Sequence, residues 1–535
     1  MHNAASTSTA DLGDTASLSV PQLVALVHAK DAVVDKLTHK ITTLEHQLDW
    51  FRRQIFGQKS ERFAPLVDPQ QLHLGQALPV PDALPVATAK PVVAHARKAP
   101  RRDFAEDAES VPFFDESKVP MVEIGLSTPE IEALSADQYE VIGQKISYRL
   151  AQQPASYTVM KYVRPVIKRR DTGTIIGVPA PLGVIEGSRA DVSFLAGMLV
   201  DKFVYHAPLY RQHQKLGDSG ITVSRPWLTQ LAQKSIALLT SIYTAQLASI
   251  RTSRVISMDE TGIKAGLDGP GKMHQSYFWP VHGDRDEICF VYSDSRRQSV
   301  IENTLGKQLP AGTVLLTDGY AAYEAYARKT GIAHARCWAH ARREFFEAQT
   351  ADPQGAAQAL EMIGALYEVE TQIRTAKLAG ESKRAFRHQH AKPIAAHFFD
   401  WIDRQFERQG LLPKNPFTQA LAYARDRRVG LEVFLTDPDV PIDNNHLERR
   451  LRAIPMGRKN WLFCWTELGA KHVGIIQSLL VTCRLHGIDP YTYLVDVLQR
   501  VGQHPASRVA ELTPRMWKQN FATHPLRSDL YATRR

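Results

Sequence analysis

The chain has 535 residues, of which 44% are hydrophobic and 23% are charged, and its formal net charge is +9 at pH 7. This length leaves room for about three or four folded units, and the composition excludes a disordered or fibrous protein. No apolar run reaches the ~18–20 residues that span a bilayer, and the first residues lack the pattern of a secretory signal, so we expect a cytoplasmic protein without membrane contact. The basic surplus favours a polyanionic partner without identifying one.

The N-terminal third is expected to contain little globular structure. Residues 1–20 are rich in Ser, Thr and Ala and predict a disordered N-terminus. Over residues 21–57, apolar side chains recur at alternating spacings of four and three, with Lys30 as the polar exception. This heptad pattern predicts a coiled-coil helix and a homo-oligomer, although one amphipathic helix packed on its own domain is the alternative. Residues 58–135 are punctuated by prolines and basic residues and predict an extended basic linker.

A small module and a helical region follow the linker. Residues 136–190 predict short strands such as Ser147–Leu150 and Thr158–Val163, separated by Pro and Gly turns. Residues 191–250 predict helices over 191–204 and 208–216, a turn at 217–220 and a third helix from Ser224, which is suited to cap it.

Two helices joined by a short Gly-containing turn are typical of a helix-turn-helix, and a plain three-helix subdomain is the alternative. In the DNA-binding case, Arg225, Trp227 and Gln230 lie at the start of the helix that reads the major groove.

Residues 251–348 show the pattern of an α/β sheet. RVISMDETG predicts a strand ending in two acids and a Gly turn, HQSYFWPVHGD and EICFVYSDS predict two antiparallel strands, and a helix follows near 298–308. GTVLLTDGY predicts a fourth strand ending at Asp318, and a helix over 320–329 leads to a fifth strand and another helix. This order is that of the ribonuclease-H-like fold. Its first and fourth strands are neighbours, so we expect Asp259 and Asp318 to lie close together.

The third acid of interest comes much later in the chain. Residues 349–440 predict a helical insertion, and residues 441–505 predict further helices of the core, followed by a C-terminal tail over 506–535. In IDNNHLERRLRA, Asp443 or Asn444 can cap a helix whose first turn carries Glu448. On that helix, Asn445 could orient Glu448 or contact a phosphate, and Arg452 is its i+4 neighbour.

Three carboxylates in this order suit a two-metal site. Cleavage of a phosphodiester by an in-line water uses two ions ~3.5–4 Å apart, and Mg²⁺, for which Mn²⁺ can substitute, prefers oxygen ligands. Singly, each acid has a structural explanation: a strand-end Asp commonly forms a turn, and Glu448 could pair with Arg452 for only ~0.3–0.5 kcal/mol. The ordered combination of Asp259, Asp318 and Glu448 favours the catalytic explanation.

Basic and aromatic residues surround Glu448 in the sequence. We expect Arg449, Arg452, Arg458 and Lys459 to neutralise DNA phosphates. Trp461, Phe463 and Trp465 interleave with them, and for Trp461 and Phe463 a place in the core is favoured over stacking on bases.

Several stretches together resemble transposases of the insertion-sequence-66 family of bacterial mobile elements. The resemblance covers roughly residues 45–500 and rests on FGQKSERF, LVDKFVYHAPLYRQ, MDETGI, LTDGYAAY, ARCWAHARREFFEA, IDNNHLERRLRAIPMGRKNWLF and IDPYTYLVDVL. It implies a DDE transposase with Asp259, Asp318 and Glu448 as its metal-binding triad and Asp259 bridging two Mg²⁺ ions. The triad spacings are 59 (318 − 259) and 130 (448 − 318) residues.

The resemblance has further implications. Such an enzyme binds the inverted-repeat ends of its element, cleaves them and joins the 3′-hydroxyl ends to target DNA, acting in the bacterial cytoplasm and on the nucleoid when DNA-bound. Accessory proteins encoded by the same element are implied partners. Cys337 and His340 match a C-x-x-H pair that could steady the fifth strand, whereas the cysteine-containing segment of many relatives is missing, since no cysteine precedes Cys289.

Two other functions stay open on the sequence alone. A ribonuclease-H-like nuclease without strand transfer needs the same fold and the same acids. A non-catalytic DNA-binding regulator needs only the helical region and the basic residues.

Overall fold

The computed structural model describes residues 30, 34, 113–117, 119–153, 156–267, 272–408, 411–461, 464 and 466–532. The chain divides into two compact units, Met1–Arg101 and Arg102–Arg535. The predicted disordered N-terminus lies outside the described residues, as do most of the predicted coiled coil and linker. Of the coiled-coil segment only Lys30 and Val34 are described, both helical and exposed. Among the described residues, no helix combines the length and apolar character needed to cross a membrane.

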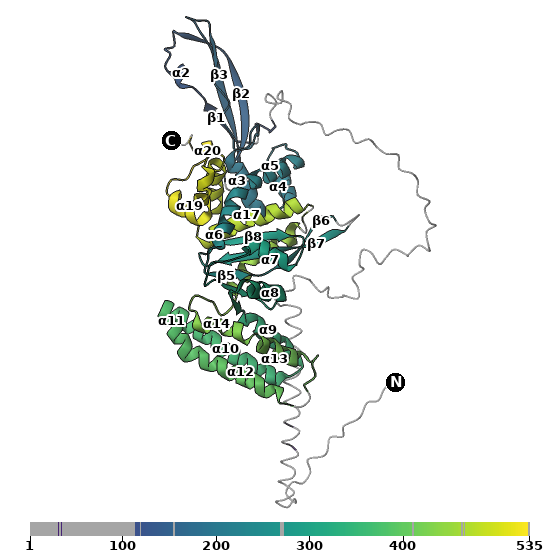
Figure 1. Ribbon diagram of the computed structural model, residues 1–535. Helices are drawn as coiled ribbons and strands as arrows, with labels where there is room; N and C mark the ends of the chain where they lie inside the picture. The colour runs from purple at the N-terminus through teal and green to yellow at the C-terminus, as the bar shows by residue number, and fades with distance from the viewer. Residues whose placement is uncertain are drawn as a thin grey trace, which may run out of the picture. The chain divides into compact units, whose positions relative to one another are not determined.

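A four-stranded sheet with one long hairpin begins the described part of the second unit (Figure 1). It contains β1 (Met121–Gly125), β2 (Tyr139–Gln153), β3 (Ser156–Arg169) and β4 (Ile175–Gly177), with the short helix α2 (Pro129–Glu132) between β1 and β2. Strand β3 is parallel to β1 and antiparallel to β2 and β4. The predicted short strands are parts of the longer β2 and β3, because a sheet solvated on one face accepts polar residues such as Lys145 within a strand.

Four helices follow, close to the predicted positions. They are α3 (Val192–Phe203), α4 (Leu209–Asp218), α5 (Arg225–Leu238) and α6 (Thr240–Ile250). The predicted cap of α5 is confirmed, since Ser224 Oγ accepts the N–H of Trp227 at 3.3 Å. Helix α4 includes Gly217, so the predicted turn is shorter than expected and begins at Ser219.

The central sheet has three parallel and three antiparallel strands. It contains β5 (Val255–Met258), β6 (Thr261–Leu267), β7 (Met273–Gly283), β8 (Ile288–Ser293), β9 (Val314–Thr317) and β10 (Ala333–Arg336). The order is β10-β9-β5-β7-β6, with β8 paired to β7; β10, β9 and β5 are parallel to one another. The predicted turn at Gly262 is wrong, because Gly262 pairs with Tyr277 inside the unexpected strand β6. Glycine adopts extended backbone as readily as a turn, so its presence did not distinguish the two.

Helices surround this sheet and close its β8 edge. Three of them alternate with its later strands: α7 (Gln298–Leu305), α8 (Ala321–Thr330) and α9 (Trp338–Glu347). On α17 (Glu467–Leu485), Ser478 Oγ accepts the N–H of Phe290 at 2.8 Å, and Thr482 Oγ1 accepts that of Ile288 at 3.2 Å. Side chains of α17 thus satisfy backbone donors that an edge strand would otherwise expose.

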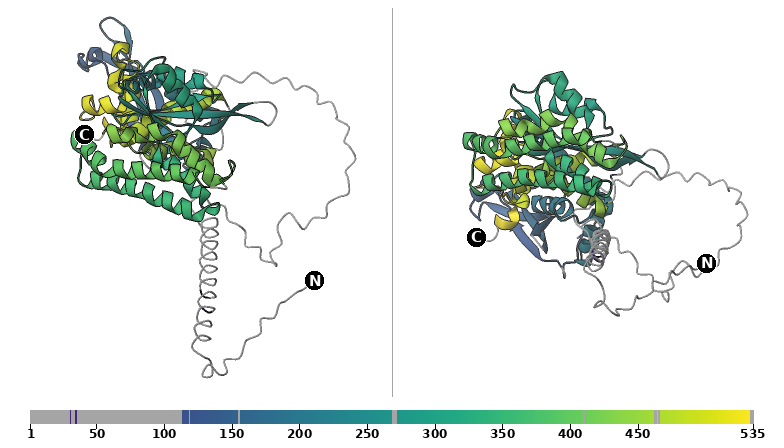
Figure 2. Two further views of the ribbon diagram at one scale, coloured as in Figure 1. Left: turned by 60° about the horizontal axis from the view of Figure 1, so that its bottom comes forward. Right: turned by 90° about the horizontal axis from the view of Figure 1, so that it is seen from below.

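A helical insertion follows α9, as predicted. Its elements are η3 (Ala348–Thr350), α10 (Pro353–Thr375), α11 (Gly380–Phe386), the π-helical turn η4 (Arg387–Ala391), α12 (Lys392–Phe406), α13 (Pro416–Asp426) and α14 (Arg428–Thr436). Figure 1 and Figure 2 show α10 and α12 side by side. Trp338, at the start of α9, is fully buried against Phe398, Phe399 and Phe434 of the insertion, so the insertion packs directly on a core helix.

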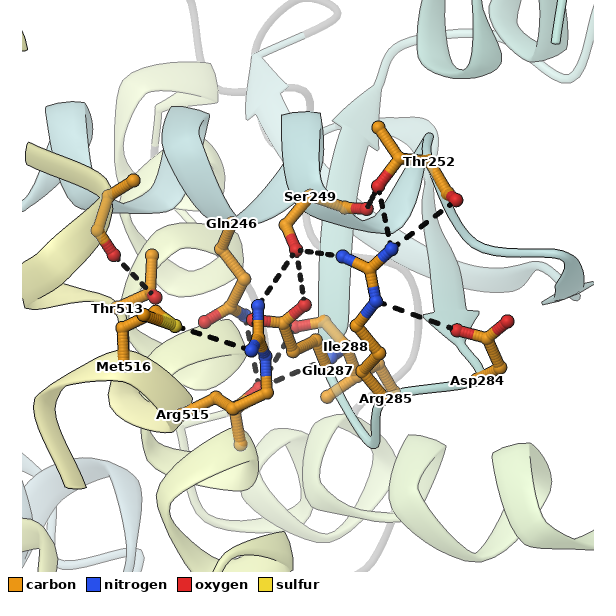
Figure 3. A network of polar contacts seen from close by, with 12 residues as sticks. Gln246, Ser249, Thr252, Asp284, Arg285, Glu287, Ile288, Thr513, Arg515 and Met516 are labelled. Atoms are coloured by element: carbon orange, nitrogen blue, oxygen red, sulfur yellow. Dashed lines mark hydrogen bonds and ion pairs between the residues drawn. The ribbon is translucent and has the colours of Figure 1, made fainter. Parts of the chain in front are cut away.

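The C-terminal part consists of short and long helices that return to the core. They are α15 (Asn445–Leu451), α16 (Ala453–Trp461), α17, α18 (Pro490–Arg500), η5 (Ala506–Leu512), α19 (Pro514–Asn520) and α20 (Asp529–Ala532). The segment after residue 506 is folded: Trp517 is 2% exposed, and its Nε1 donates to Asp496 at 2.9 Å. Figure 3 shows Arg515 beside Glu287 at the start of β8, where their ion pair measures 3.1 Å.

Candidate active site

Asp259 and Asp318 come directly after two neighbouring parallel strands. The pairing of β5 with β9 sets Ser257 opposite Leu316, so the same register continued by two residues sets Asp259 opposite Asp318. The predicted adjacency of the first and fourth strands of the core is therefore confirmed. Asp318 is fixed by its backbone and side chain together, since its carbonyl accepts Arg336 Nη1 at 2.6 Å and its Oδ1 accepts the N–H of Tyr320 at 3.0 Å.

Glu448 approaches this sheet edge from the first turn of α15. Two contacts anchor the start of that helix to the core. His446 Nε2 lies 3.2 Å from Ser257 Oγ on β5, and the N–H of Asn444 donates to Cys337 Sγ at 3.4 Å. These contacts join the helix that carries Glu448 to β5, which leads to Asp259, and to the residue that follows β10.

The cap of α15 involves Asn445, for which the sequence predicts either an orienting contact to Glu448 or a phosphate contact. Asp443 Oδ1 accepts the N–H of Asn445 at 3.1 Å, and its Oδ2 accepts Asn445 Nδ2 at 2.6 Å. Asn444 occupies the N-cap position without a side-chain cap bond. The Asn445 amide thus contacts Asp443 rather than Glu448, although Asn445 lines the same cavity as Glu448. A phosphate contact from Asn445 stays a prediction.

One cavity of about 620 Å³ brings the three predicted acids together. Among the described residues, four carboxyl groups and four arginines contribute to its lining. The carboxyl groups are those of Asp259, Glu260, Asp318 and Glu448, and the arginines are Arg296, Arg343, Arg449 and Arg452. Such a lining places a concentration of negative charge beside cations that can bind a polyanion.

The acids of the cavity act on one another. The pKa of Asp259 is raised to about 8, mainly by burial, with a smaller contribution from the charges of Asp318, Glu260 and Glu448 and against a hydrogen bond from the N–H of Glu260. Burial lowers the pKa of His340, whose Nε2 lies 3.8 Å from Glu448 Oε1. The imidazole is therefore neutral at neutral pH and adds no positive charge beside Glu448.

Glu260 belongs to the cavity, although the sequence assigned it no role. Its side chain is 4% exposed and accepts hydrogen bonds from Arg296 Nε at 2.9 Å and the Tyr323 hydroxyl at 2.8 Å. Arg296 also stacks over the ring of Tyr320 at 4.4 Å. The adjacent acids of MDETG are visible in the sequence, but no local pattern pairs Glu260 with residues that lie far along the chain.

The C-x-x-H pair lies between β10 and the helix of Glu448. Cys337 occupies the N-cap position of α9, and burial raises its pKa to about 12, so the sulfur is a neutral thiol that accepts from the N–H of Asn444. His340, one turn into α9, lines the cavity. Both residues follow β10, the predicted fifth strand. Cys337 contacts the start of the Glu448 helix, and His340 contacts Glu448 itself.

The predicted DNA-contacting residues after Glu448 differ in their surroundings. Arg449 and Arg452 are exposed and line the cavity. Arg458 Nη1 donates to the carbonyl of Gly262 on β6, which engages part of its guanidinium, and Lys459 is exposed on α16. Trp461 packs against the core as expected, whereas Phe463 and Trp465 lie outside the described residues.

The other predicted DNA-contacting residues lie on α5, in the helical region. Arg225 and Gln230 are exposed there, and the guanidinium of Arg225 lies 4.8 Å from the ring centre of Tyr210. Trp227 stacks on Phe194 of α3 at 5.9 Å and packs against the core. Trp227 thus helps to hold α5 on α3, and the DNA-reading role of the start of α5 stays a prediction.

The donor set of the cavity fits divalent cations. Among the described residues, no group of three or more His, Cys, Asp or Glu side chains is arranged to hold a metal ion by itself. Mg²⁺ does not require such a group, because it keeps several waters and binds through one or two carboxylates plus phosphate oxygens. The carboxyl oxygens of Asp259, Asp318 and Glu448 are hard donors of that kind.

The fold and cavity define a mixed α/β protein whose strand-end acids are flanked by arginines. The family described as Transposase IS66 family matches residues 187–472, which include all three predicted acids. Two further family matches cover residues 478–515 (IS66 C-terminal element) and 43–107 (Transposase C of IS166 homeodomain). The chain belongs to the IS66 transposase family. The last match spans parts of the predicted coiled coil and linker, outside the described residues.

Similar proteins of comparable length occur in Sinorhizobium fredii. The protein y4hP is 29% identical over 510 residues, which cover 90% of this chain and 90% of the relative. The protein y4jD is 28% identical over 513 residues, which cover 91% of this chain and 96% of the relative. Both are described as uncharacterized proteins, so they support the extent of the likeness and assign no activity.

Proposed function

We propose that this chain is a DDE transposase that binds the inverted-repeat ends of an insertion sequence, cleaves phosphodiesters and joins the 3′-hydroxyl ends to target DNA. The observation that carries the proposal is the single cavity that unites Asp259, Asp318 and Glu448. These residues come from two core strands and a distant helix, and all three fall within the IS66 transposase match.

The proposal includes a ribonuclease-H-like core. Its support is the sheet, in which antiparallel strands precede the parallel strands β9 and β10, and in which helices alternate with the later strands. The helical insertion then separates this sheet from α15, which agrees with the long interval of 130 residues (448 − 318) between the last two acids.

In the proposed mechanism, Asp259, Asp318 and Glu448 would hold two Mg²⁺ or Mn²⁺ ions. Bound there, the ions supply electrophilic stabilisation of the attacking and leaving oxygens of the phosphodiester. Asp259 must release its proton to act as a ligand, so with its raised pKa a metal ion would compete with the proton for this carboxylate. A neutral His340 leaves the charge of Glu448 available to a cation.

The arginines of the cavity have a separate task in this mechanism. Arg449 and Arg452 bind phosphate oxygens beside the scissile bond and keep the DNA strand in register with the acids. The exposed residues Arg225 and Gln230 on α5 contact DNA away from the cleavage site. Duplex DNA is thus the proposed partner, as both element end and target.

Two partners lie beyond the residues that the structure describes. A homo-oligomer formed through residues 21–57 would bring two element ends together, and accessory proteins from the same element would complete the assembly. Both follow from the sequence pattern and the family resemblance, and they remain proposals.

The test is cleavage of a supercoiled plasmid that carries the gene with its flanking DNA. We expect Asp318→Asn and Glu448→Gln to lower Mg²⁺-dependent cleavage by about 10³-fold or more, in line with loss of electrostatic stabilisation, while DNA binding is retained. Asp426→Asn, an exposed carboxylate on α13, is the matched control and should cleave normally. Full cleavage by Asp318→Asn would sink the assignment.

Strand transfer separates the proposed function from a nuclease with the same fold. A pre-cut element end with a free 3′-hydroxyl is incubated with wild-type protein, Mg²⁺ and a target plasmid. Covalent joining is the expected result, whereas repeated cleavage without joining identifies a nuclease, and metal-independent binding without cleavage identifies a regulator.

A further inference from the structure

A second cavity lies beside the first, between the helical insertion and α15. Its volume is about 650 Å³, and it shares two lining residues, Asn445 and Arg449, with the acidic cavity. The rest of its wall comes from α10, α11, the turn η4 and the segment just before α15. The two cavities therefore adjoin at Asn445 and Arg449.

Some charges of this second cavity are already used within the protein. Arg387 forms a two-bonded ion pair with Glu370, at 2.7 and 2.9 Å, and donates to backbone carbonyls as well. Asp443 accepts two hydrogen bonds from Asn445 at the start of α15. Because Arg387, Glu370 and Asp443 bind groups within the protein, they stabilise the walls of the cavity and are not available to bind a ligand.

Three cations of the lining remain for a ligand. Arg374, Lys383 and Arg449 come from α10, α11 and α15, and within the described residues none of them forms an ion pair. Arg374 Nη2 donates to Thr371 Oγ1 at 2.8 Å, which uses one of its donors. Burial lowers the pKa of His446 to about 4, so this lining residue adds no positive charge at neutral pH.

We propose that the second cavity binds the phosphodiester backbone of the DNA strand next to the scissile phosphate. This inference rests on the proposed function, since it extends the path of the cleaved strand from the acids, over Arg449, to Lys383 and Arg374. A recessed wall with cations from three elements suits an extended polyanion better than a small anion. The helical insertion is then a DNA-binding element.

The ligand chemistry follows from the surroundings of Lys383. Its ammonium group is half-buried, and burial together with the charge of Arg387 lowers its pKa. A charged lysine in such a place is stabilised by an anion that enters the cavity, and phosphate oxygens are the anions that a strand leaving the acidic cavity carries. The neighbouring hydroxyl of Tyr367 also lines the cavity, and burial raises its pKa, so it keeps its proton as a donor.

The test compares two adjacent residues of α11. Lys383→Gln removes a cation from the cavity wall, whereas Arg384→Gln removes the same charge from an exposed side chain that is paired with Glu381 at 2.8 Å. Full-length variants bind a fluorescein-labelled duplex of arbitrary sequence in EDTA at several salt concentrations. Phosphate contacts are independent of sequence, so this probe reports them without knowledge of the element ends.

We expect Lys383→Gln and Arg374→Gln each to weaken binding about five- to tenfold at ~0.1 M salt. Each should also reduce the slope of log affinity against log salt by about 0.9, the value for one lost phosphate contact. Arg384→Gln should leave the slope unchanged. An unaltered slope in Lys383→Gln and Arg374→Gln, or an equal change in Arg384→Gln, overturns the inference.

Two measurements distinguish the loss of a phosphate contact from unfolding of the variant and from failure of the proposed function. Thermal unfolding establishes that the variants are folded, because an unfolded variant would lose every contact and not a single one. Cleavage by the wild-type protein, tested as described for the proposed function, is independent of the slopes. Absence of cleavage overturns the proposed function, whereas normal cleavage with unchanged slopes overturns only the role of the second cavity.

Discussion

Among the acids of the first cavity, the raised pKa of Asp259 makes the free energy of unfolding depend on pH. Its pKa of about 8 means that, between about pH 4 and pH 8, the folded chain keeps a proton that the unfolded chain releases. The free energy of unfolding therefore falls as pH rises through this range, and the full loss is reached above pH 8. A divalent cation reverses the loss, because it stabilises the ionised carboxylate.

We expect Asp259→Asn to stabilise the metal-free protein by about 2 kcal/mol at pH 8 and by much less at pH 5, since the amide cannot ionise. Chemical unfolding in EDTA at both pH values measures the difference. Added Mg²⁺ should stabilise the wild type and not the variant, so the difference in free energy of unfolding between them should disappear. Asp426→Asn serves as the exposed control, and a variant less stable than the wild type at pH 8 in EDTA would contradict the assignment.

At the scale of elements, the insertion controls the segment that delivers Glu448. This segment, residues 437–444, is here called the strap. Arg387 Nη1 donates to the carbonyls of Phe434, Asp437 and Val440 at 2.8, 3.1 and 3.0 Å. From the core, Arg254 binds both carboxylate oxygens of Asp437 at 2.7 and 2.6 Å. The strap is thus held from both sides before it enters α15.

We predict that Arg387→Lys loosens the strap. A lysine ammonium group cannot pair with both carboxylate oxygens of Glu370 and donate to several backbone carbonyls at once, as the planar guanidinium does. The free energy of unfolding should fall by about 2 kcal/mol, and amide hydrogen exchange should accelerate over the strap. The charge in the second cavity is preserved, so DNA affinity should change little. Arg384→Lys, at an exposed position one helical turn earlier, is the control, and equal exchange in both variants would refute the role of Arg387.

Sequence reasoning succeeded where the signal was local in the chain. Strand-end acids placed Asp259 and Asp318, the Ser224 cap placed α5, and the motif around residue 448 singled out Glu448. It failed where local preference is ambiguous, because Gly262 suits a turn and a strand equally. Only packing against neighbouring elements decides such cases.

Contacts between distant residues could not be predicted from one sequence. Glu260 meets Arg296 and Tyr323, which follow it by 36 and 63 residues. The bond from Asn444 to Cys337 spans 107 residues. No periodicity or capping rule encodes these pairs, because they result from the path of the whole chain.

At the scale of the whole molecule, the C-terminal helices close the core rather than trail from it. Glu287 is fully buried, pairs with Arg515 at 3.1 Å and accepts from Ser249 Oγ at 2.6 Å (Figure 3). Arg285 also donates to Ser249 Oγ, at 3.3 Å, but it is more exposed. The network therefore joins α6, the start of β8 and α19, which lie far apart in the sequence.

We expect Arg515→Ala to destabilise the protein by about 3 kcal/mol, because it leaves a buried carboxylate without its partner. Arg285→Ala, which removes an exposed arginine from the same network, should change stability by less than about 1 kcal/mol. Denaturant unfolding of both variants provides the comparison. Glu287→Gln should restore part of the loss when combined with Arg515→Ala, and the absence of any rescue would show that the ion pair is not the cause.

Because Asp259 and Asp318 are synthesised well before Glu448, the nascent chain passes through a stage with only two of the three acids. Glu448 follows Asp259 by 189 residues (448 − 259), and at about 5–20 residues per second a ribosome needs roughly 10–40 s to cover that distance. During this interval both aspartates are already present, whereas α17, which covers the β8 edge, is not. The nascent chain also lacks its third carboxylate until the insertion and strap have emerged, so under the proposed function we expect a ribosome-bound or prematurely terminated product to be unable to cleave DNA.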